Sequence, residues 1–251
     1  MPPSLRPDGP QVDAGPVDAP QVNAPRGLGA RILLITDPAY DAAHVDATIV
    51  AVATALAAVA HASGALAVQL RDKSATPSAL RVRARALRAL TASCGASLIV
   101  NGDPAIAAAV DADGVHVPGF ARDVDAIPRV RAIVGPARSI HVPVHTLEEA
   151  KLARDAGVDA LLVSPIFDSP GKGPARGPSA LEEVRDLAHQ PPLRATLRVL
   201  RIYALGGVDV SRVSECHQAG ADGVAVIRAL FDAPDPVATA NYLILPWLTA
   251  S

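Results

Sequence analysis

Short apolar segments alternate with longer stretches of helical periodicity along most of this chain. Eight of the apolar segments are predicted to be strands, at 31–36, 65–71, 97–101, 114–117, 138–143, 160–164, 199–205 and 223–227, and six segments share a layout in which an apolar strand ends in a polar cluster. The helix-like stretches include 78–91, 147–156, 211–219 and a last helix after Pro236. Strict alternation of the two kinds predicts a parallel sheet, because each parallel connection needs a crossover.

A parallel sheet of this kind is either open and doubly wound or closed into a barrel. An open sheet usually has a glycine-rich turn after its first strand, whereas residues 35–38 read Ile-Thr-Asp-Pro. Eight units in 251 residues agree with a closed barrel, which takes about 250 residues. We therefore predict an α/β fold, a single (β/α)8 TIM barrel, with its chemistry at the C-terminal ends of the strands.

The domain organisation follows from the composition of the N-terminal segment. Residues 1–28 are rich in proline and polar residues and contain no apolar core of a signal sequence, so we predict a disordered leader there and a barrel domain over 29–251. Within the barrel, residues 156–160 and 219–223 repeat a phrase of Ala-Gly, a variable residue and Asp. The glycine follows a helix and precedes a strand, so the repeat is expected at the bottom of the barrel, where it serves stability.

Composition and charge exclude several classes of partner. A net charge of −2 provides no basic surface for nucleic acid or an anionic membrane. The apolar run 47–60 is shorter than the roughly 20 residues that a bilayer needs, so we expect a packed helix, compatible with a homodimer contact. Cys94 and Cys216 have no closely spaced Cys or His partners, which indicates free thiols in a reducing cytoplasm and no metal site.

The second predicted strand ends in a cluster of polar side chains. Gln69, Arg71 and Lys73 alternate with Leu70 and Asp72, and alternation along a strand points the three to one side. Two cations and an amide aimed at one place suit a phosphate or diphosphate ester. We predict that all three bind substrate.

A second anion site is predicted at the ends of the seventh and eighth strands. Gly206 and Gly207 follow one of these strands, and Ile227 and Arg228 end the other. A glycine pair lets backbone amides approach an anion closely, and barrels often hold a phosphate in these two loops. A tight turn without a ligand is the alternative.

Four further rim residues are candidates for chemistry. His145 lies where the fifth strand gives way to a helix, and catalysis and a structural role are both open for it. Lys172 lies in a Gly- and Pro-rich loop and is either a substrate ligand or a solvated side chain. Asn101 ends the third strand, and Asp103 near it is either a weak magnesium candidate or a helix cap.

In this order, these motifs resemble those of the thiamine phosphate synthase and TenI superfamily, over about 32–231. The markers are 68–73 (Val-Gln-Leu-Arg-Asp-Lys), 100–101, 112–116, 145–150, 164–167 with Lys172, 204–207 and 219–226. The resemblance implies a (β/α)8 barrel that handles thiazole phosphate in thiamine biosynthesis, with small phosphate esters as partners. It also implies that Gln69, Arg71, Lys73, Asn101, Lys172, Gly206, Gly207, Ile227 and Arg228 bind substrate.

Two activities divide that superfamily, and particular positions distinguish them. In the synthase pattern two aspartates bind magnesium, but the first of these positions is Gly102 here, and 116–121 (His-Val-Pro-Gly-Phe-Ala) lacks the second. Asn101-Gly102 and Pro118 instead match the TenI type, a thiazole tautomerase in which His145 would be the acid and base. The resemblance therefore favours a TenI-like isomerase without cofactor or metal.

Two alternatives stay open. The complete set of Gln69, Arg71 and Lys73 favours a thiamine phosphate synthase, a transferase that joins a pyrimidine diphosphate to thiazole phosphate with magnesium. Pro143 stands where the family has a serine, and Arg228 replaces another serine at the phosphate site. These two departures favour a non-catalytic protein that binds thiazole or thiamine phosphate.

Overall fold

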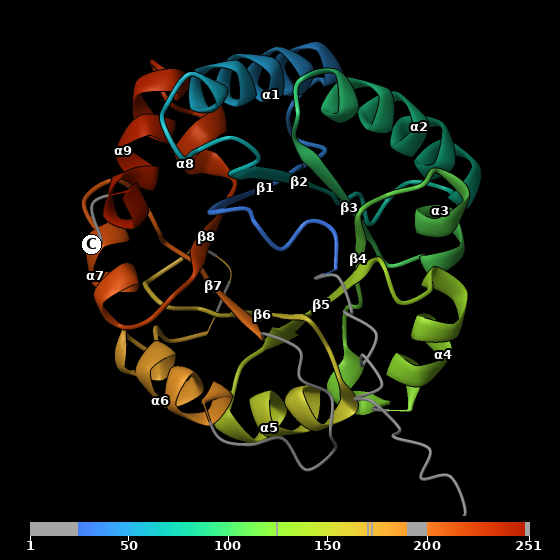
Figure 1. Cartoon of the computed structure of the whole chain (residues 1–251), viewed down its shortest axis with the longest axis vertical. Helices are drawn as coiled ribbons and strands as arrows, with labels where there is room; N and C mark the ends of the chain where they lie inside the picture. Colours follow the sequence, from blue (N-terminus) through green and yellow to red (C-terminus); the bar gives the residue numbers. More distant parts are fainter. Residues whose placement is uncertain (1–24, 124, 170, 172, 190–199, 249–251) are drawn as a thin grey trace, which may run out of the picture.

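The computed structural model describes residues 25–123, 125–169, 171, 173–189 and 200–248. Eight parallel strands close into a barrel in the order β1 to β8, with β1 paired to both β2 and β8. The helices form a ring outside the strands (Figure 1). The predicted single (β/α)8 barrel is confirmed. The strands are β1 Ile32–Ile35, β2 Leu66–Leu70, β3 Ser97–Asn101, β4 Gly114–His116, β5 Ser139–Val144, β6 Ala160–Val163, β7 Arg201–Leu205 and β8 Gly223–Val226.

Each crossover contains a helix whose start is set by local sequence. Asp41 caps the first by accepting from the His44 N–H, and Thr76 caps the second, which begins with Pro77. The predicted last helix after Pro236 is confirmed. The helices are α1 Ala42–Ala57, α2 Pro77–Ser93, α3 Pro104–Ala109, α4 Ala126–Val134, α5 Leu147–Ala156, α6 Ser179–Ala188, α7 Val213–Gln218, α8 Arg228–Phe231 and α9 Pro236–Leu248, with a 3-10 turn, η1, at Phe120–Arg122.

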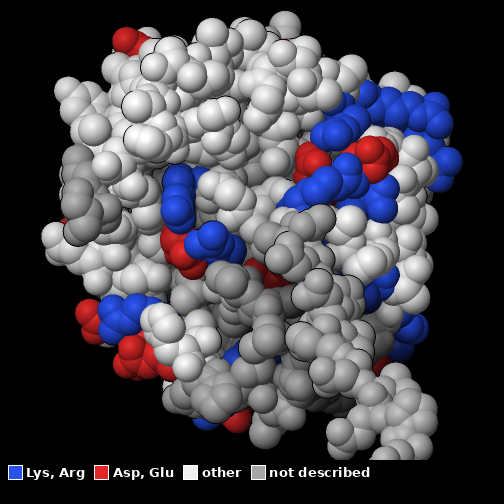
Figure 2. Space-filling model, in the orientation of Figure 1, with Lys and Arg blue, Asp and Glu red and all other residues white. Residues whose placement is uncertain are grey.

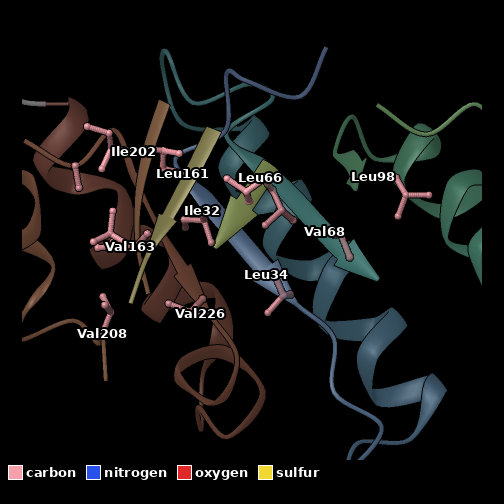
Figure 3. Packing of buried hydrophobic residues seen from close by; sticks show 14 of the residues in the cluster. Ile32, Leu34, Leu66, Val68, Leu98, Leu161, Val163, Ile202, Val208 and Val226 are labelled. Carbon is pink, nitrogen blue, oxygen red and sulfur yellow. The ribbon is translucent and has the colours of Figure 1, made fainter. Parts of the chain in front are cut away.

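The strands are buried on both faces, so they separate two apolar layers. Side chains such as Ile32, Leu34 and Val68 point outward and pack against the helices (Figure 3). Leu33 and Ile35 point into the barrel, where they meet Tyr203 and small side chains from other strands. Burial of an aliphatic side chain contributes about 1.5–3 kcal/mol, and the outer layer contains most of these side chains.

The repeated aspartate phrase lies at the bottom of the barrel, as predicted. Asp159 accepts from the Ile140 N–H at 2.8 Å, Asp222 from the Ile202 N–H at 2.9 Å, and Asp113 from the Leu98 N–H at 2.9 Å. Each also pairs with an arginine: Arg131, Arg201 and Arg88 in the same order. Every one of these aspartates thus ties the start of its own strand to the preceding strand.

The last residues of the predicted leader, 25–28, pack against this same end of the barrel. The Arg26 N–H donates to the Ala137 oxygen at 2.9 Å, and the Arg26 side chain pairs with Asp111. Leu28 is buried with the residues inside the barrel, and the segment before β1 crosses the barrel opening in Figure 1. Packing therefore begins before residue 29, and residues 1–24 lie outside the described part of the chain. Figure 2 shows acidic and basic side chains next to each other on this face.

The apolar run 47–60 lies mostly within α1, which packs against α2, α8 and α9. Val45, Ile49, Val52 and Leu56 on this helix are buried. Among the described helices, none combines the length and the apolar character needed to span a bilayer.

Candidate active site

A cavity of about 420 Å³ opens at the C-terminal ends of β7 and β8. Gly206, Gly207, Ile227 and Arg228, the four residues predicted for an anion site at these strands, all line it. The tertiary structure therefore brings these two distant sequence segments to one place. Asp168, Ser169, Asp209 and Arg212 lie in the same lining.

The glycine pair is required by close approach of the segment after β6. Gly206 and Gly207 have φ of 102° and 63°, and a Cβ on Gly207 would lie 2.6 Å from the Asp168 carbonyl oxygen. The Phe167 N–H donates to the Gly206 oxygen at 3.0 Å, which holds that segment in place. The turn is therefore tight and also opens onto the cavity.

Arg212 is a cavity residue that sequence reasoning missed. Its Nη1 donates to the Gly207 oxygen at 2.7 Å, and its guanidinium lies 4.9 Å from the centre of the Phe167 ring. The sequence signal that could have indicated it is an arginine five positions after Gly207. This arginine lies in the stretch 211–219, for which the sequence predicts only a helix.

The three residues predicted to bind substrate at the end of β2, Gln69, Arg71 and Lys73, differ in burial. Gln69 is buried, and its Oε1 accepts from Asn101 Nδ2 at 3.0 Å. The Gln69 Nε2 is buried without a hydrogen-bond partner among the described residues, so a donor remains for a ligand. Arg71 is half-buried and Lys73 is exposed. The Thr36 hydroxyl holds the Arg71 backbone by accepting from its N–H at 2.9 Å and donating to its oxygen at 3.2 Å.

Two histidines lie inside the barrel next to this cluster. His116 and His141 are register partners on β4 and β5, and both are buried. Burial, followed by the influence of His141 and Arg71, lowers the pKa of His116 to about 3. Burial lowers the pKa of His141 to about 4, against an opposing effect of Asp159. Both are therefore neutral at pH 7.

His145 lies at the end of β5, at the start of α5. Its Nδ1 is 2.8 Å from the Ser164 carbonyl oxygen at the end of β6. Thr146 caps α5 by accepting from the Glu149 N–H at 3.1 Å, and the Glu149 carboxylate accepts from the His145 N–H. These cap contacts fix His145 at the rim. Lys172 lies outside the residues that the structure describes.

The carboxylates near the rim do not fit a magnesium site of the synthase pattern. Asp103 caps α3, its Oδ1 accepting from the N–H groups of Ala105 and Ile106, which is one of the two roles considered for it. Asp123 forms an ion pair with Arg129. Within the described ranges, no group of three or more His, Cys, Asp or Glu side chains is arranged to hold a metal ion.

The fold is a (β/α)8 barrel with a cavity at the C-terminal ends of its strands. The family model described as thiamine monophosphate synthase (TMP-TENI) matches residues 32–230. The chain therefore belongs to the thiamine monophosphate synthase family.

Individual relatives agree with this assignment. A thiamine-phosphate synthase of Roseiflexus sp. (strain RS-1) is 38% identical over 192 residues, 76% of each chain. That of Moorella thermoacetica is 39% identical over 182 residues, 72% of this chain and 82% of the relative. A solved thiamine phosphate pyrophosphorylase from Pyrococcus furiosus superposes with a TM-score of 0.69 at 24% identity, over 88% of this chain and 96% of that chain, which supports the fold.

The prediction of a TenI-like tautomerase is wrong. Relatives named thiamine-phosphate synthase match at 34–39% identity over most of the chain, and they favour an enzyme of the synthase type. The prediction rested on a few positions, Asn101-Gly102 and Pro118, whereas the family match extends over residues 32–230. The same relatives speak against a protein that only binds its ligand.

Proposed function

We propose that this protein is a thiamine-phosphate synthase, a transferase that joins a pyrimidine diphosphate to thiazole phosphate and releases diphosphate. The relatives of that name carry this proposal, because they match about three quarters of the chain. The cavity at β7 and β8 supports it, since glycine backbone and two guanidiniums line a space suited to a phosphate ester.

The two anionic groups of the substrates would occupy neighbouring parts of the rim. The thiazole phosphate binds in the cavity at Gly206 and Gly207, and the diphosphate binds at Arg71 and Lys73 after β2. Because β1 alone separates β8 from β2, the two anions flank one strand and the reacting atoms meet between them. Gln69 near the end of β2 and Asn101 at the end of β3 provide amide groups next to the proposed diphosphate site at Arg71.

The reaction needs a good leaving group more than an acid or a base. The bond between the pyrimidine methylene carbon and the diphosphate oxygen breaks, and its electron pair leaves with diphosphate. The lone pair of the thiazole nitrogen forms the new carbon–nitrogen bond. Fixed cations stabilise the charge that develops on the leaving group. Since the rim carboxylates do not fit a metal, Arg71 and Lys73 are the groups assigned to this task, with Lys172 as a further ligand.

The experiment is an assay of the purified protein with both substrates, following thiamine phosphate and released diphosphate together. We expect equimolar formation of the two products, and retention of most turnover when EDTA replaces magnesium. Arg71→Ala should lower kcat/KM by about 10- to 100-fold, because it removes a charge-assisted contact. Arg71→Lys should recover part of the loss, and Arg81→Ala, an exposed site on α2, is the matched control. No product under either condition would reject the function, and strict magnesium dependence would reject the cation assignment alone.

We also infer a homodimer through α1 and α9. Val50 on α1 and Tyr242 and Leu245 on α9 are exposed, and the two helices contact each other. The α1 surface in Figure 2 is mostly uncharged. A two-fold contact places a surface against itself, so an uncharged face avoids repulsion between like charges. Sedimentation velocity should give a dimer mass that Leu245→Glu converts to the monomer; a monomeric parent protein would contradict the inference.

A further inference from the structure

Arg212 is held in place before any ligand arrives. One N–H of its guanidinium donates to the Gly207 oxygen, and the guanidinium carbon lies over the Phe167 ring, 4.9 Å from its centre. An arginine stacked on an aromatic ring and hydrogen-bonded to backbone has little side-chain freedom left to lose on binding. Its position depends on two segments, the turn after β7 and the segment after β6.

The remaining donors of this guanidinium are suited to an anion. A guanidinium has five N–H donors, and the Gly207 oxygen uses one of them. The side chain lines the same cavity as the glycine pair and Ile227. Planar guanidinium groups bind phosphate oxygens with two parallel hydrogen bonds, which a single ammonium group does not reproduce.

The charges of the cavity lining indicate why binding of a phosphate would need the positive charge of Arg212. A phosphate monoester carries about −1.5 to −2 charges at pH 7. Asp168 and Asp209 also line the cavity, although the Asp209 carboxylate accepts from the Ser211 N–H and hydroxyl. Arg212 and Arg228 are the cations in the described lining, so loss of either leaves the cavity with a net negative charge. Arg228 is exposed, whereas Arg212 is partly buried and fixed.

We propose that Arg212 is a phosphate-binding residue that makes the β7–β8 cavity selective for a phosphorylated ligand over its free alcohol. The identity of the ligand, thiazole phosphate, rests on the proposed function. The selectivity itself rests on the cavity geometry. The phosphate accepts from the unused N–H groups of Arg212, while the Gly207 oxygen and the Phe167 ring keep the guanidinium in position.

The test is calorimetric titration of the full chain with thiazole phosphate and, separately, with the corresponding thiazole alcohol. Arg212→Ala should weaken binding of the phosphate by about 10- to 100-fold and that of the alcohol by less than about threefold. Arg212→Lys should bind the phosphate with an affinity between those of the parent protein and Arg212→Ala, because lysine keeps the charge and lacks the two parallel N–H donors of the guanidinium. Arg81→Ala should change neither. Equal loss for the two ligands would show a merely structural role, and unchanged binding of the phosphate would overturn the proposal.

Further outcomes separate this proposal from the synthase activity. If the alanine variant does not fold, by circular dichroism, Arg212→Lys and Arg212→Gln carry the comparison, and the phosphate preference should fall in the order Arg, Lys, Gln. Selective phosphate binding without synthase turnover would reject the proposed function and leave the role of Arg212 standing. Turnover by a parent protein that binds phosphate and alcohol equally well would reject the role of Arg212 alone.

Discussion

The Nδ1 atom of His145 lies 2.8 Å from the carbonyl oxygen of Ser164. A carbonyl oxygen only accepts hydrogen bonds, so Nδ1 of the neutral ring carries the proton and Nε2 is the acceptor nitrogen. The contact joins the end of β5 to the end of β6. It gives His145 one tautomer and one anchor point at the rim, where the substrates of a synthase would meet.

For a synthase, His145→Ala should lower kcat/KM by only about 10-fold. The proposed transfer breaks a carbon–oxygen bond and forms a carbon–nitrogen bond without removing a proton from carbon, so a general base adds less than the 10²–10⁴-fold typical of proton transfer. Steady-state kinetics with both substrates would measure the effect. His145→Asn, whose amide N–H replaces Nδ1 toward Ser164, should recover part of the loss if positioning is the role. A loss beyond about 1,000-fold would instead assign a proton transfer to His145.

The unpartnered Nε2 of Gln69 predicts a separation between activity and stability. Gln69→Leu keeps the side-chain size and should lower kcat/KM by about 10- to 100-fold, because a donor for the substrate is lost. The free energy of unfolding should stay within about 1 kcal/mol, because losing the acceptor of the Asn101 Nδ2 hydrogen bond is offset by removing a buried donor that has no partner among the described residues. Kinetics and urea unfolding on the same preparations would measure both. Unchanged activity would contradict a substrate-binding role for Gln69.

The buried histidines predict loss of stability in mild acid. The folded-state pKa values of about 3 for His116 and about 4 for His141 lie below the ordinary value of 6.5, so between these values the unfolded chain binds more protons. Stability is therefore retained above pH 6.5 and falls as the pH decreases toward 4. At pH 5 each histidine should cost about 2 kcal/mol relative to pH 7.

Urea unfolding at pH 7 and pH 5 would measure this difference. His141→Gln should reduce the loss by about 2 kcal/mol, because the amide does not titrate. Substitution of the exposed His61 by Gln is the control and should leave the pH dependence unchanged. A parent protein with equal stability at the two pH values would contradict the assignment.

Substitution of a buried and of an exposed aspartate should have very different effects on the free energy of unfolding. Asp159 has no exposed side-chain surface and pairs with Arg131 and the Ile140 N–H, so Asp159→Ala should cost about 3–5 kcal/mol by leaving a buried charge unpaired. Asp123 is 55% exposed and pairs with Arg129, so Asp123→Ala should cost less than about 1 kcal/mol. Denaturant unfolding of both variants would test this contrast. If the two substitutions lowered the free energy of unfolding equally, the contacts of Asp159 between β5 and β6 would not contribute the predicted stability.

Sequence patterns predicted the barrel because each element depends on its own residues. The short apolar run 160–163 is bounded by a glycine turn before it and a Ser-Pro pair after it, and Thr146 with Glu149 starts a helix through contacts four residues apart or fewer. The repeat at 156–160 located the bottom of the barrel for the same reason. Polar residues at the strand ends, such as Gln69 and Asn101, were predictable as a set because parallel strands end at one rim.

The activity type was not predictable from the same local evidence. Gly102 and Pro118 are two single positions that change which side chains surround the rim. Similarity over three quarters of the chain carries more information than these positions, because the remaining rim and core residues together determine which substrates fit.

The sequence by itself determined the alternation of elements, the barrel and the set of polar strand ends, since all of these follow from periodicity and order along the chain. Only the tertiary structure decided that Arg212 lies over Phe167 and beside Gly207, and that His116 and His141 are neutral neighbours inside the barrel. The contact of Arg212 with Phe167 and the pairing of His116 with His141 join residues from different β/α units. Their distances depend on how the barrel closes, which no local pattern encodes.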